Sequence, residues 1–184
     1  MIELKNISLT FDGRQVLKEL SLSLPEKGIL LITGPSGCGK TSVARMILGL
    51  LRPTEGEVLV KDAKIAAVFQ EDRLVPTLTA LENVALVSDR AEAEKRLSQV
   101  GLADSLNLLP EELSGGMKRR VAIARALAFG GDILLLDEAF TGLDEELAEK
   151  VLKELCEEFK DKLIIAVTHR PELFEDYEYT EIKL

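Results

Sequence analysis

The N-terminal part of the chain, up to Leu24, alternates between apolar and polar positions. Apolar side chains recur at every second position in two short runs, and the pair Asp12-Gly13 separates the runs. A period of two is typical of strands that bury one face, and Asp-Gly is a favoured two-residue hairpin turn. The pattern therefore predicts an antiparallel hairpin within residues 2–24.

Three later segments are apolar at nearly every position. They read "GILLIT" (28–33), "DILLLD" (132–137) and "LIIAVT" (163–168). Unbroken apolar runs of this length are expected of strands that are buried on both faces. We also expect shorter strands, for which the chain offers residues 57–60, residues 64–69 and the C-terminal "YEYTEIKL".

Helical patterns lie between these strands. Residues 145–159 place apolar side chains four positions apart, after an acidic first turn that suits the helix dipole. Strands that alternate with helices favour an α/β core with a parallel sheet and right-handed crossovers. Residues 71–128 carry no strand pattern, so we expect a helical insert there, beside an N-terminal antiparallel β subdomain. Another helix is predicted over residues 40–51, where Pro53 and Gly56 would stop it. Further helices are predicted over residues 79–86 and 90–100, and from a Ser114 cap to about Phe129.

The composition fits one domain that spans residues 1–184. Of the 184 residues, 46% are hydrophobic, which is enough for a full core. No apolar run approaches the ~18 residues that a membrane span needs, and the N-terminus does not resemble a secretory signal. Cys38 and Cys156 lie far apart and indicate a reducing compartment, so we expect a cytoplasmic location.

The net charge of −9 argues against broad binding to nucleic acids or to anionic membranes. Two interpretations remain open for the one basic cluster. It is either a solvated helix face or local support for phosphate chemistry near Ser114. The cluster consists of Lys118, Arg119, Arg120 and Arg125.

The segment "GPSGCGKT" (34–41) matches the phosphate-binding pattern G-x-x-x-x-G-K-[ST] in full. It also follows a buried strand and opens a helix, as this loop requires. Its glycines let backbone amides turn toward phosphate oxygens, and the helix N-terminus adds positive potential. Lys40 can reach the β- and γ-phosphates, the Thr41 hydroxyl can ligate Mg²⁺, and Ser42 is placed for the α-phosphate. The sequence therefore predicts a P-loop NTPase core.

Acidic and imidazole side chains follow the other two buried strands. Asp137 ends "ILLLD" and Glu138 comes next, while His169, the only histidine, follows "LIIAVT". Ligands of parallel sheets bind at the C-terminal edge, where these side chains would emerge. One acid could hold Mg²⁺ through water while the other polarises the attacking water. His169 could contact the γ-phosphate or orient the water, although its position could also be incidental.

A second candidate anion site lies in "LSGGMKRR" (113–120). It sets Ser114, Gly115 and Gly116 just ahead of a predicted helix, and a helix start of this kind suits an anion. One small domain with a complete P-loop has no evident need for a second such loop.

Together these motifs resemble the nucleotide-binding subunit of ABC (ATP-binding cassette) transporters, over nearly the whole chain and in the family's order. "LSGG" resembles the signature, residues 133–137 the Walker B strand, and "TGLD" (141–144) the D-loop. His169 resembles the switch histidine, Gln70 the Q-loop glutamine, and Phe11 the aromatic residue that stacks on adenine. The chain departs from the family at Met117, where glutamine is commonest.

The resemblance implies the reaction ATP + H₂O → ADP + phosphate. It implies that Thr41, Gln70 and Asp137 organise Mg²⁺, that Glu138 is the general base and that His169 supports the γ-phosphate. Lys40 and Gln70 complete the implied catalytic set. The implied ATP-binding residues are Phe11, Gly34, Pro35, Ser36, Gly37, Cys38, Gly39, Lys40, Thr41 and Ser42.

The resemblance also implies which nucleotide the second anion site contacts. In this family two chains pair head to tail around two ATP molecules. Ser114, Gly115, Gly116 and Asp144 of one chain would then close over the nucleotide that the P-loop of the other holds. Donors supplied in trans are a recognised way to meet the charge of phosphoryl transfer.

The resemblance further implies transport through separate permease subunits, with this chain peripheral on the inner face of the cell membrane. Residues 70–86 are similar to the segment that docks the membrane subunit in importers of nitrate, sulfonate or taurine type. Import, served by a solute-binding protein, is therefore expected. An exporter or lipid-handling complex is one alternative, and a soluble ABC ATPase is another. The chain ends soon after His169, so we expect no regulatory domain, and nucleic acid is not an expected partner.

Overall fold

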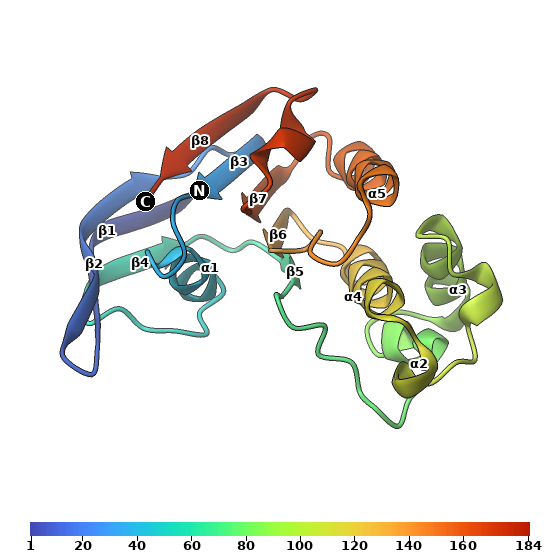
Figure 1. The fold of residues 1–184 in the computed structure, drawn as a ribbon. Helices are drawn as coiled ribbons and strands as arrows, with labels where there is room; N and C mark the ends of the chain where they lie inside the picture. Colours follow the sequence, from blue (N-terminus) through green and yellow to red (C-terminus); the bar gives the residue numbers. More distant parts are fainter.

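The computed structural model describes residues 1–184 and arranges them as two sheets and a group of helices (Figure 1). The smaller sheet is antiparallel, with the strand order β2-β1-β4. It contains β1 (Ile2–Phe11), β2 (Arg14–Ser23) and β4 (Glu55–Val60). Asp12 and Gly13 have φ angles of 47° and 78°, as a tight hairpin turn requires. The predicted hairpin is present, and β4 pairs with β1 on its other side.

The larger sheet has five strands in the order β5-β6-β7-β3-β8, and every pairing in it is parallel. All five positions of β6 and of β7 are buried, as their apolar runs predict. A parallel sheet places the carboxyl ends of all its strands along one edge. The strands are β3 (Gly28–Thr33), β5 (Ile65–Val68), β6 (Ile133–Asp137), β7 (Leu163–Val167) and β8 (Tyr179–Lys183).

Helices connect the parallel strands. α1 (Lys40–Ile47) follows β3, and α5 (Glu145–Glu158) follows β6. Between β5 and β6 the chain forms helices only, and Figure 1 shows this group, coloured green to yellow, on the far side of the parallel sheet from β1 and β2. These helices are α2 (Ala80–Ala85), α3 (Arg90–Gln99) and α4 (Gly115–Phe129), with short 3₁₀ turns at Ala103–Ser105 and Pro110–Glu112. A third 3₁₀ turn, Pro171–Phe174, lies between β7 and β8.

α1 ends four residues earlier than its pattern predicts. Gly49 takes a φ of 70°, its amide donates to the carbonyl of Met46 (3.0 Å), and the Leu50 amide donates to that of Arg45 (2.8 Å). This pair of hydrogen bonds is the Schellman arrangement, which closes a helix at a left-handed glycine. Gly49, rather than Pro53, is therefore what stops α1.

The parallel sheet separates two hydrophobic cores. Leu134 and Leu136 of β6 belong to the core formed with α4 and α5. Ile133 and Leu135 of the same strand belong to the core formed with α1 and the antiparallel sheet. Because successive strand residues point to opposite faces, a strand between two cores must be apolar throughout. No helix of the chain is long and apolar enough to span a bilayer.

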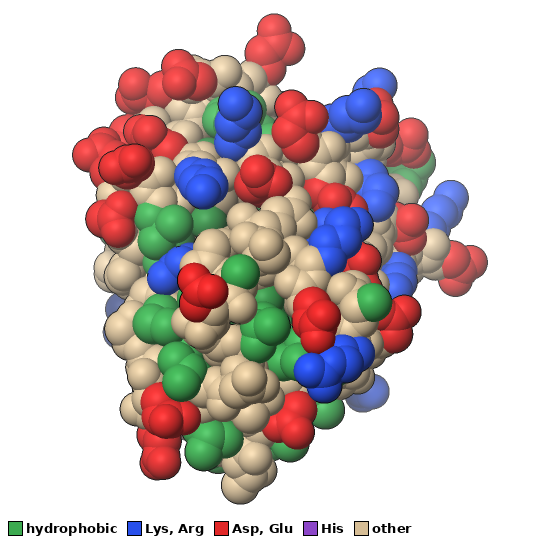
Figure 2. Space-filling view, turned by 90° about the vertical axis from the view of Figure 1, so that its right-hand side faces the viewer, with side chains coloured by type: hydrophobic (Ala, Val, Ile, Leu, Met, Phe, Trp, Pro, Cys, Tyr) green, Lys and Arg blue, Asp and Glu red, His purple; other side chains and the backbone are tan.

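A buried arginine ties α3 to α5. The Arg96 guanidinium donates to both carboxylate oxygens of Glu158 (2.8 and 2.9 Å) and also to Glu92. Gln99 adds a hydrogen bond to Glu154 (2.7 Å). The hydrogen bonds from Arg96 hold the pKa of Glu158 below its usual value. On the surrounding surface, Figure 2 shows acidic and basic side chains interspersed over the face that carries these helices.

Substitution of Glu158 tests the ion pair between Arg96 and Glu158. Because the Glu158 side chain is 37% exposed, solvent screening limits the free energy that the pair contributes. We expect Glu158→Gln to lower the free energy of unfolding by about 1 kcal/mol at neutral pH. That loss corresponds to a fall of roughly 2–4 °C in melting temperature for a chain of this size. A carboxylate with a depressed folded pKa stabilises above its unfolded pKa and loses that contribution as the pH falls through the folded pKa. The difference between parent and variant should therefore vanish in acid.

The matched control is Glu157→Gln, which removes the same charge from a neighbouring exposed side chain outside the Arg96 cluster. Its melting temperature should equal that of the parent at every pH. Equal melting temperatures for the Glu158 variant and this control would show that the tie contributes nothing.

Candidate nucleotide-binding site

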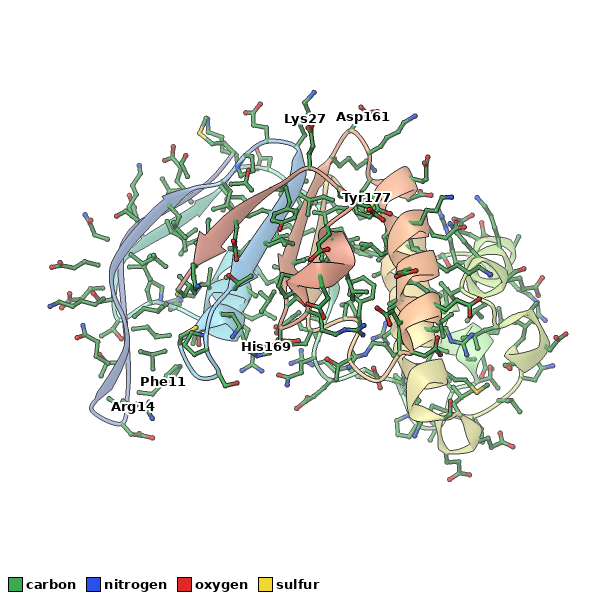
Figure 3. All side chains as sticks on the ribbon, turned by 45° about the horizontal axis from the view of Figure 1, so that its top comes forward. Phe11, Arg14, Lys27, Asp161, His169 and Tyr177 are labelled. Carbon is green, nitrogen blue, oxygen red and sulfur yellow. The ribbon has the colours of Figure 1, made fainter.

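A cleft of about 610 Å³ opens at the carboxyl edge of the parallel sheet. Figure 3 shows Phe11 and His169 on this side of the molecule, while Lys27 and Asp161, which precede β3 and β7, lie at the opposite end. Twelve residues line the cleft, and ten of them are polar or glycine. The lining consists of Phe11, Val16, Ser36, Gly37, Gly39, Lys40, Thr41, Ser42, Gln70, Glu138, Thr141 and His169.

The loop between β3 and α1 forms the floor of the cleft. Gly39 has a φ of 105°, and a Cβ there would lie 2.8 Å from the Leu17 side chain, so only glycine fits. No side chain caps the start of α1, which leaves its first amides free for a ligand. The Lys40 ammonium is buried and donates to the carbonyls of Gly34 (2.9 Å) and Pro35 (3.0 Å). The floor can therefore bind an anion through amides and one lysine.

Asp137 does not line the cleft, but it forms a hydrogen bond with Thr41, which does. The Thr41 hydroxyl donates to Asp137 Oδ1 (3.1 Å), and Asp137 is buried beneath it. Burial raises the pKa of Asp137, while the hydrogen bond from Thr41 and nearby cations partly offset the rise. The buried carboxylate therefore costs stability when ionised, and a bound cation would relieve that cost.

Glu138 and His169 form a pair at the mouth of the cleft. His169 Nε2 lies 3.3 Å from Glu138 Oε1, with 47% of the histidine side chain and 13% of the glutamate side chain exposed. Glu138 adopts a φ of 52°, and its amide donates to the carbonyl of Val167 (2.9 Å). Such backbone strain in a non-glycine residue is concentrated at functional sites. The pair can polarise a water molecule placed over the P-loop.

The other end of the cleft is apolar. Phe11 is 47% exposed at the end of β1, and Val16 of β2 joins it in the lining. Sequence reasoning identified Phe11 but missed Val16 and Thr141. Val16 carried no chemical signal, because only the β1–β2 pairing places it near Phe11. Thr141 opens the segment "TGLD", which resembles the D-loop, but only Asp144 of that segment was assigned to a site.

The Ser-Gly-Gly residues and Asp144 do not line this cleft. Ser114 caps α4 by accepting a hydrogen bond from the Met117 amide (3.2 Å), and Asp144 caps α5 in the same way. A Cβ on Gly116 would lie 3.3 Å from the carbonyl oxygen of Gly142, so the first turn of α4 packs against the loop that precedes α5. Ser114, Gly115 and Asp144 are exposed. Gly34, Pro35 and Cys38 belong to the loop without lining the cleft.

A P-loop that joins a buried strand to an uncapped helix, beside an acid at the end of a neighbouring strand, defines a nucleotide-binding α/β domain. The chain belongs to the ABC transporter family, whose model matches residues 17–141. Within that family its fold is the one of the ATP-binding subunits, with a parallel five-stranded sheet, an antiparallel three-stranded sheet and a helical part.

Three similar proteins illustrate the match. The bicarbonate transport ATP-binding protein of Synechocystis sp. is 40% identical over 84% of this chain, which spans 62% of that protein's length. The L-cystine import ATP-binding protein of Bacillus subtilis is 40% identical, with 94% of this chain and 77% of that protein covered. A dimeric ATP-binding cassette in a post-hydrolysis state, bound to ADP and Pi, superposes with a TM-score of 0.90 at 33% identity, covering 99% of this chain and 94% of the other.

Asp137 offers a direct test of the electrostatics of the cleft. Because burial raises its folded pKa, the ionised carboxylate destabilises the chain above that pKa and has no effect once protonated in both states. We expect Asp137→Asn to raise the melting temperature at neutral pH in EDTA by about 2–4 °C, the shift that roughly 1 kcal/mol produces. The gain should disappear as the pH falls toward the ordinary range of an aspartate. Thermal denaturation at several pH values measures both effects.

Asp104→Asn is the control, because Asp104 is exposed. It should leave the melting temperature unchanged. A loss of stability in Asp137→Asn at neutral pH would contradict this account of the buried carboxylate.

Proposed function

We propose that this chain hydrolyses ATP and thereby drives solute transport through separate membrane subunits. The observation that carries the proposal is the Glu138–His169 pair at 3.3 Å in the cleft whose floor is the uncapped start of α1. An acceptor for a water proton thus shares one cleft with an anion-binding loop. The similarity to transport ATP-binding proteins supports the coupling to transport.

In the proposed complex, the P-loop binds the phosphates and the apolar end of the cleft binds the base. Lys40 would exchange its hydrogen bonds to loop carbonyls for the β- and γ-phosphates. The loop amides and the Ser42 hydroxyl would donate to the remaining phosphate oxygens. Phe11 offers its exposed ring to adenine, with Val16 beside it.

The residues around Asp137 fit a magnesium ion. Thr41 and Asp137 present two oxygen donors 3.1 Å apart, and Gln70 lines the same cleft. No group of three or more His, Cys, Asp or Glu side chains is placed to hold a metal, so phosphate oxygens and water would complete the six ligands that Mg²⁺ prefers. When bound, Mg²⁺ would supply charge neutralisation to the phosphates and to the buried Asp137 carboxylate.

Hydrolysis requires a water molecule in line with the γ-phosphate. Glu138 would accept a proton from this water, and its strained backbone holds the carboxylate beside His169. His169 would orient the water or donate to the γ-phosphate. Water oxygen then bonds to phosphorus as the bond to the ADP oxygen breaks, which yields ADP and phosphate. The developing negative charge is met by Lys40 and the loop amides.

We propose that a second copy of the chain completes the site. Ser114, Gly115, Gly116 and Asp144 lie outside the cleft of their own chain and are exposed or half-buried. The Ser114 hydroxyl and the first amides of α4 suit the γ-phosphate that another copy binds. Two chains paired head to tail would then enclose two ATP molecules, and the dimeric arrangement of the similar cassette supports this pairing.

A groove of about 380 Å³ fits a membrane subunit. It lies between the end of α1, the segment after β5 and the end of α4, and eight of its ten lining residues are hydrophobic. Leu50 and Phe129 expose 58% and 37% of their surface there, and Arg73 forms part of its edge. An apolar groove of this size suits a short amphipathic helix. We propose that a permease subunit docks here.

The proposal places the chain on the inner face of the cell membrane, as one domain with residues 71–128 as its helical part. The import functions of the similar proteins favour import, served by a solute-binding protein. The net charge of −9 gives no reason to expect a nucleic-acid partner.

Glu138→Gln tests the proposed reaction. The amide keeps the shape of the side chain but cannot accept the proton, so we expect turnover to fall by ~10²–10⁴-fold while ATP binding persists. Phosphate release measures turnover, and size exclusion with ATP should reveal an accumulated ATP-bound dimer. Glu145→Gln, an exposed change in the first turn of α5, should hydrolyse ATP at the parental rate. A Glu138 variant with parental turnover would rule out the assigned general base.

A further inference from the structure

One buried arginine of α4 binds the backbone of the segment that carries Gln70. Arg119 is 6% exposed, and its two terminal nitrogens donate to the carbonyls of Phe69 and Gln70, each at 2.5 Å. Its Nε lies 3.2 Å from a carboxylate oxygen of Asp72. Within the basic cluster, Arg119 is therefore neither solvated nor available to a phosphate, because its guanidinium binds backbone carbonyls.

A second arginine of the same helix continues the contact. Arg125 donates to the carbonyls of Asp72 (2.9 Å) and Arg73 (3.0 Å). Arg73 has a φ of 49°, and its guanidinium lies 4.1 Å from the centre of the Phe69 ring. Four carbonyls of this segment, those of Phe69, Gln70, Asp72 and Arg73, thus accept hydrogen bonds from arginines of one helix.

These hydrogen bonds replace the ones that a sheet would supply. β5 pairs with β6 only as far as Val68, so the carbonyls that follow have no strand partner. Buried carbonyls need donors, and the planar fork of an arginine can serve two neighbouring ones at once. The backbone that carries Gln70, two residues beyond β5, is therefore held by hydrogen bonds from α4.

The same helix begins at the Ser-Gly-Gly segment. Ser114 is the N-cap of α4, and Arg119 follows five positions later, little more than one helical turn away. Over that distance a hydrogen-bonded helix moves as one piece. A shift of α4 would therefore carry the Gln70 backbone with it, while the rest of the cleft stays with the sheet.

We propose that Arg119 is a positioning residue for Gln70, which it fixes to the helix that carries Ser114. The inference rests on the proposed function and deepens it, because it makes the place of Gln70 in the cleft depend on the pose of α4. Gln70 is then in place for hydrolysis only when α4 is correctly oriented.

A double-mutant cycle with Gln70→Ala and Arg119→Gln tests the inference, with kcat and KM for Mg-ATP measured for all four proteins. If Arg119 acts through Gln70, Arg119→Gln lowers kcat about ten-fold in the parent and less than two-fold in the Gln70→Ala background. KM should change less than two-fold, because the P-loop is untouched. Equal losses of kcat in the two backgrounds, or no loss in the parent, would overturn the inference.

Arg120→Gln is the matched control. Arg120 is the next residue of the helix and also binds two carbonyls, those of Val100 and Gly101, but neither belongs to the Gln70 segment. Its effect on kcat should be the same with and without the Gln70 side chain. A control that depended on Gln70 as strongly as Arg119 does would show that any disturbance of α4 has this effect, which would also overturn the specific assignment.

Arg119→Lys provides a second variant if Arg119→Gln does not fold, with folding judged by circular dichroism. The ammonium keeps the charge and can serve one carbonyl, so kcat should lie between those of the parent and Arg119→Gln, and again be unaffected without Gln70. An effect of the same size in both backgrounds would refute the positioning role. A parent chain that does not hydrolyse ATP would refute the proposed function and this inference together, whereas an active parent with independent mutational effects would refute the inference alone.

Discussion

The parallel register of the large sheet is the constraint on which the cleft depends. It brings the end of β3, which leads into the P-loop, beside the ends of β7 and β6. Asp137 at the end of β6 and His169 just after β7 thereby lie at the same edge as the P-loop, where Thr41 binds Asp137 and Glu138 contacts His169. The sheet itself is held between the two hydrophobic cores, which bury the apolar side chains on both of its faces.

The residues that form the cleft suit three of the groups that hydrolysis needs, and all of them come from one chain. Backbone amides and Lys40 suit phosphates, Asp137 and Thr41 suit a cation, and Glu138 with His169 suits a water molecule. Nothing from the Ser-Gly-Gly helix reaches this cleft, although its N-terminus has the chemistry of an anion site. A second copy of the chain is the simplest source of a Ser-Gly-Gly segment that faces the nucleotide. The Arg119 contact would then make the position of one cleft residue, Gln70, depend on the orientation of α4.

Sequence patterns predicted the features that depend on local chemistry. The apolar runs of β6 and β7, the Asp-Gly hairpin and the P-loop all follow from residue type and spacing. Features that depend on tertiary contacts were out of reach. Val16 enters the cleft only through strand pairing, and Arg119 looks like any surface arginine until the segment after β5 turns back against α4. The early end of α1 was missed because Gly49 was outweighed by the more conspicuous Pro53.

The central claim is that two copies of the chain build each nucleotide site. The rate of ATP hydrolysis per chain, measured at saturating Mg-ATP over a wide range of chain concentration, tests it most directly. If the site is shared, the specific rate should fall as the chain is diluted below the dissociation constant of the ATP-bound dimer, and should approach proportionality to concentration. A specific rate that stays constant down to the lowest measurable concentration would show that one copy suffices and would contradict the account.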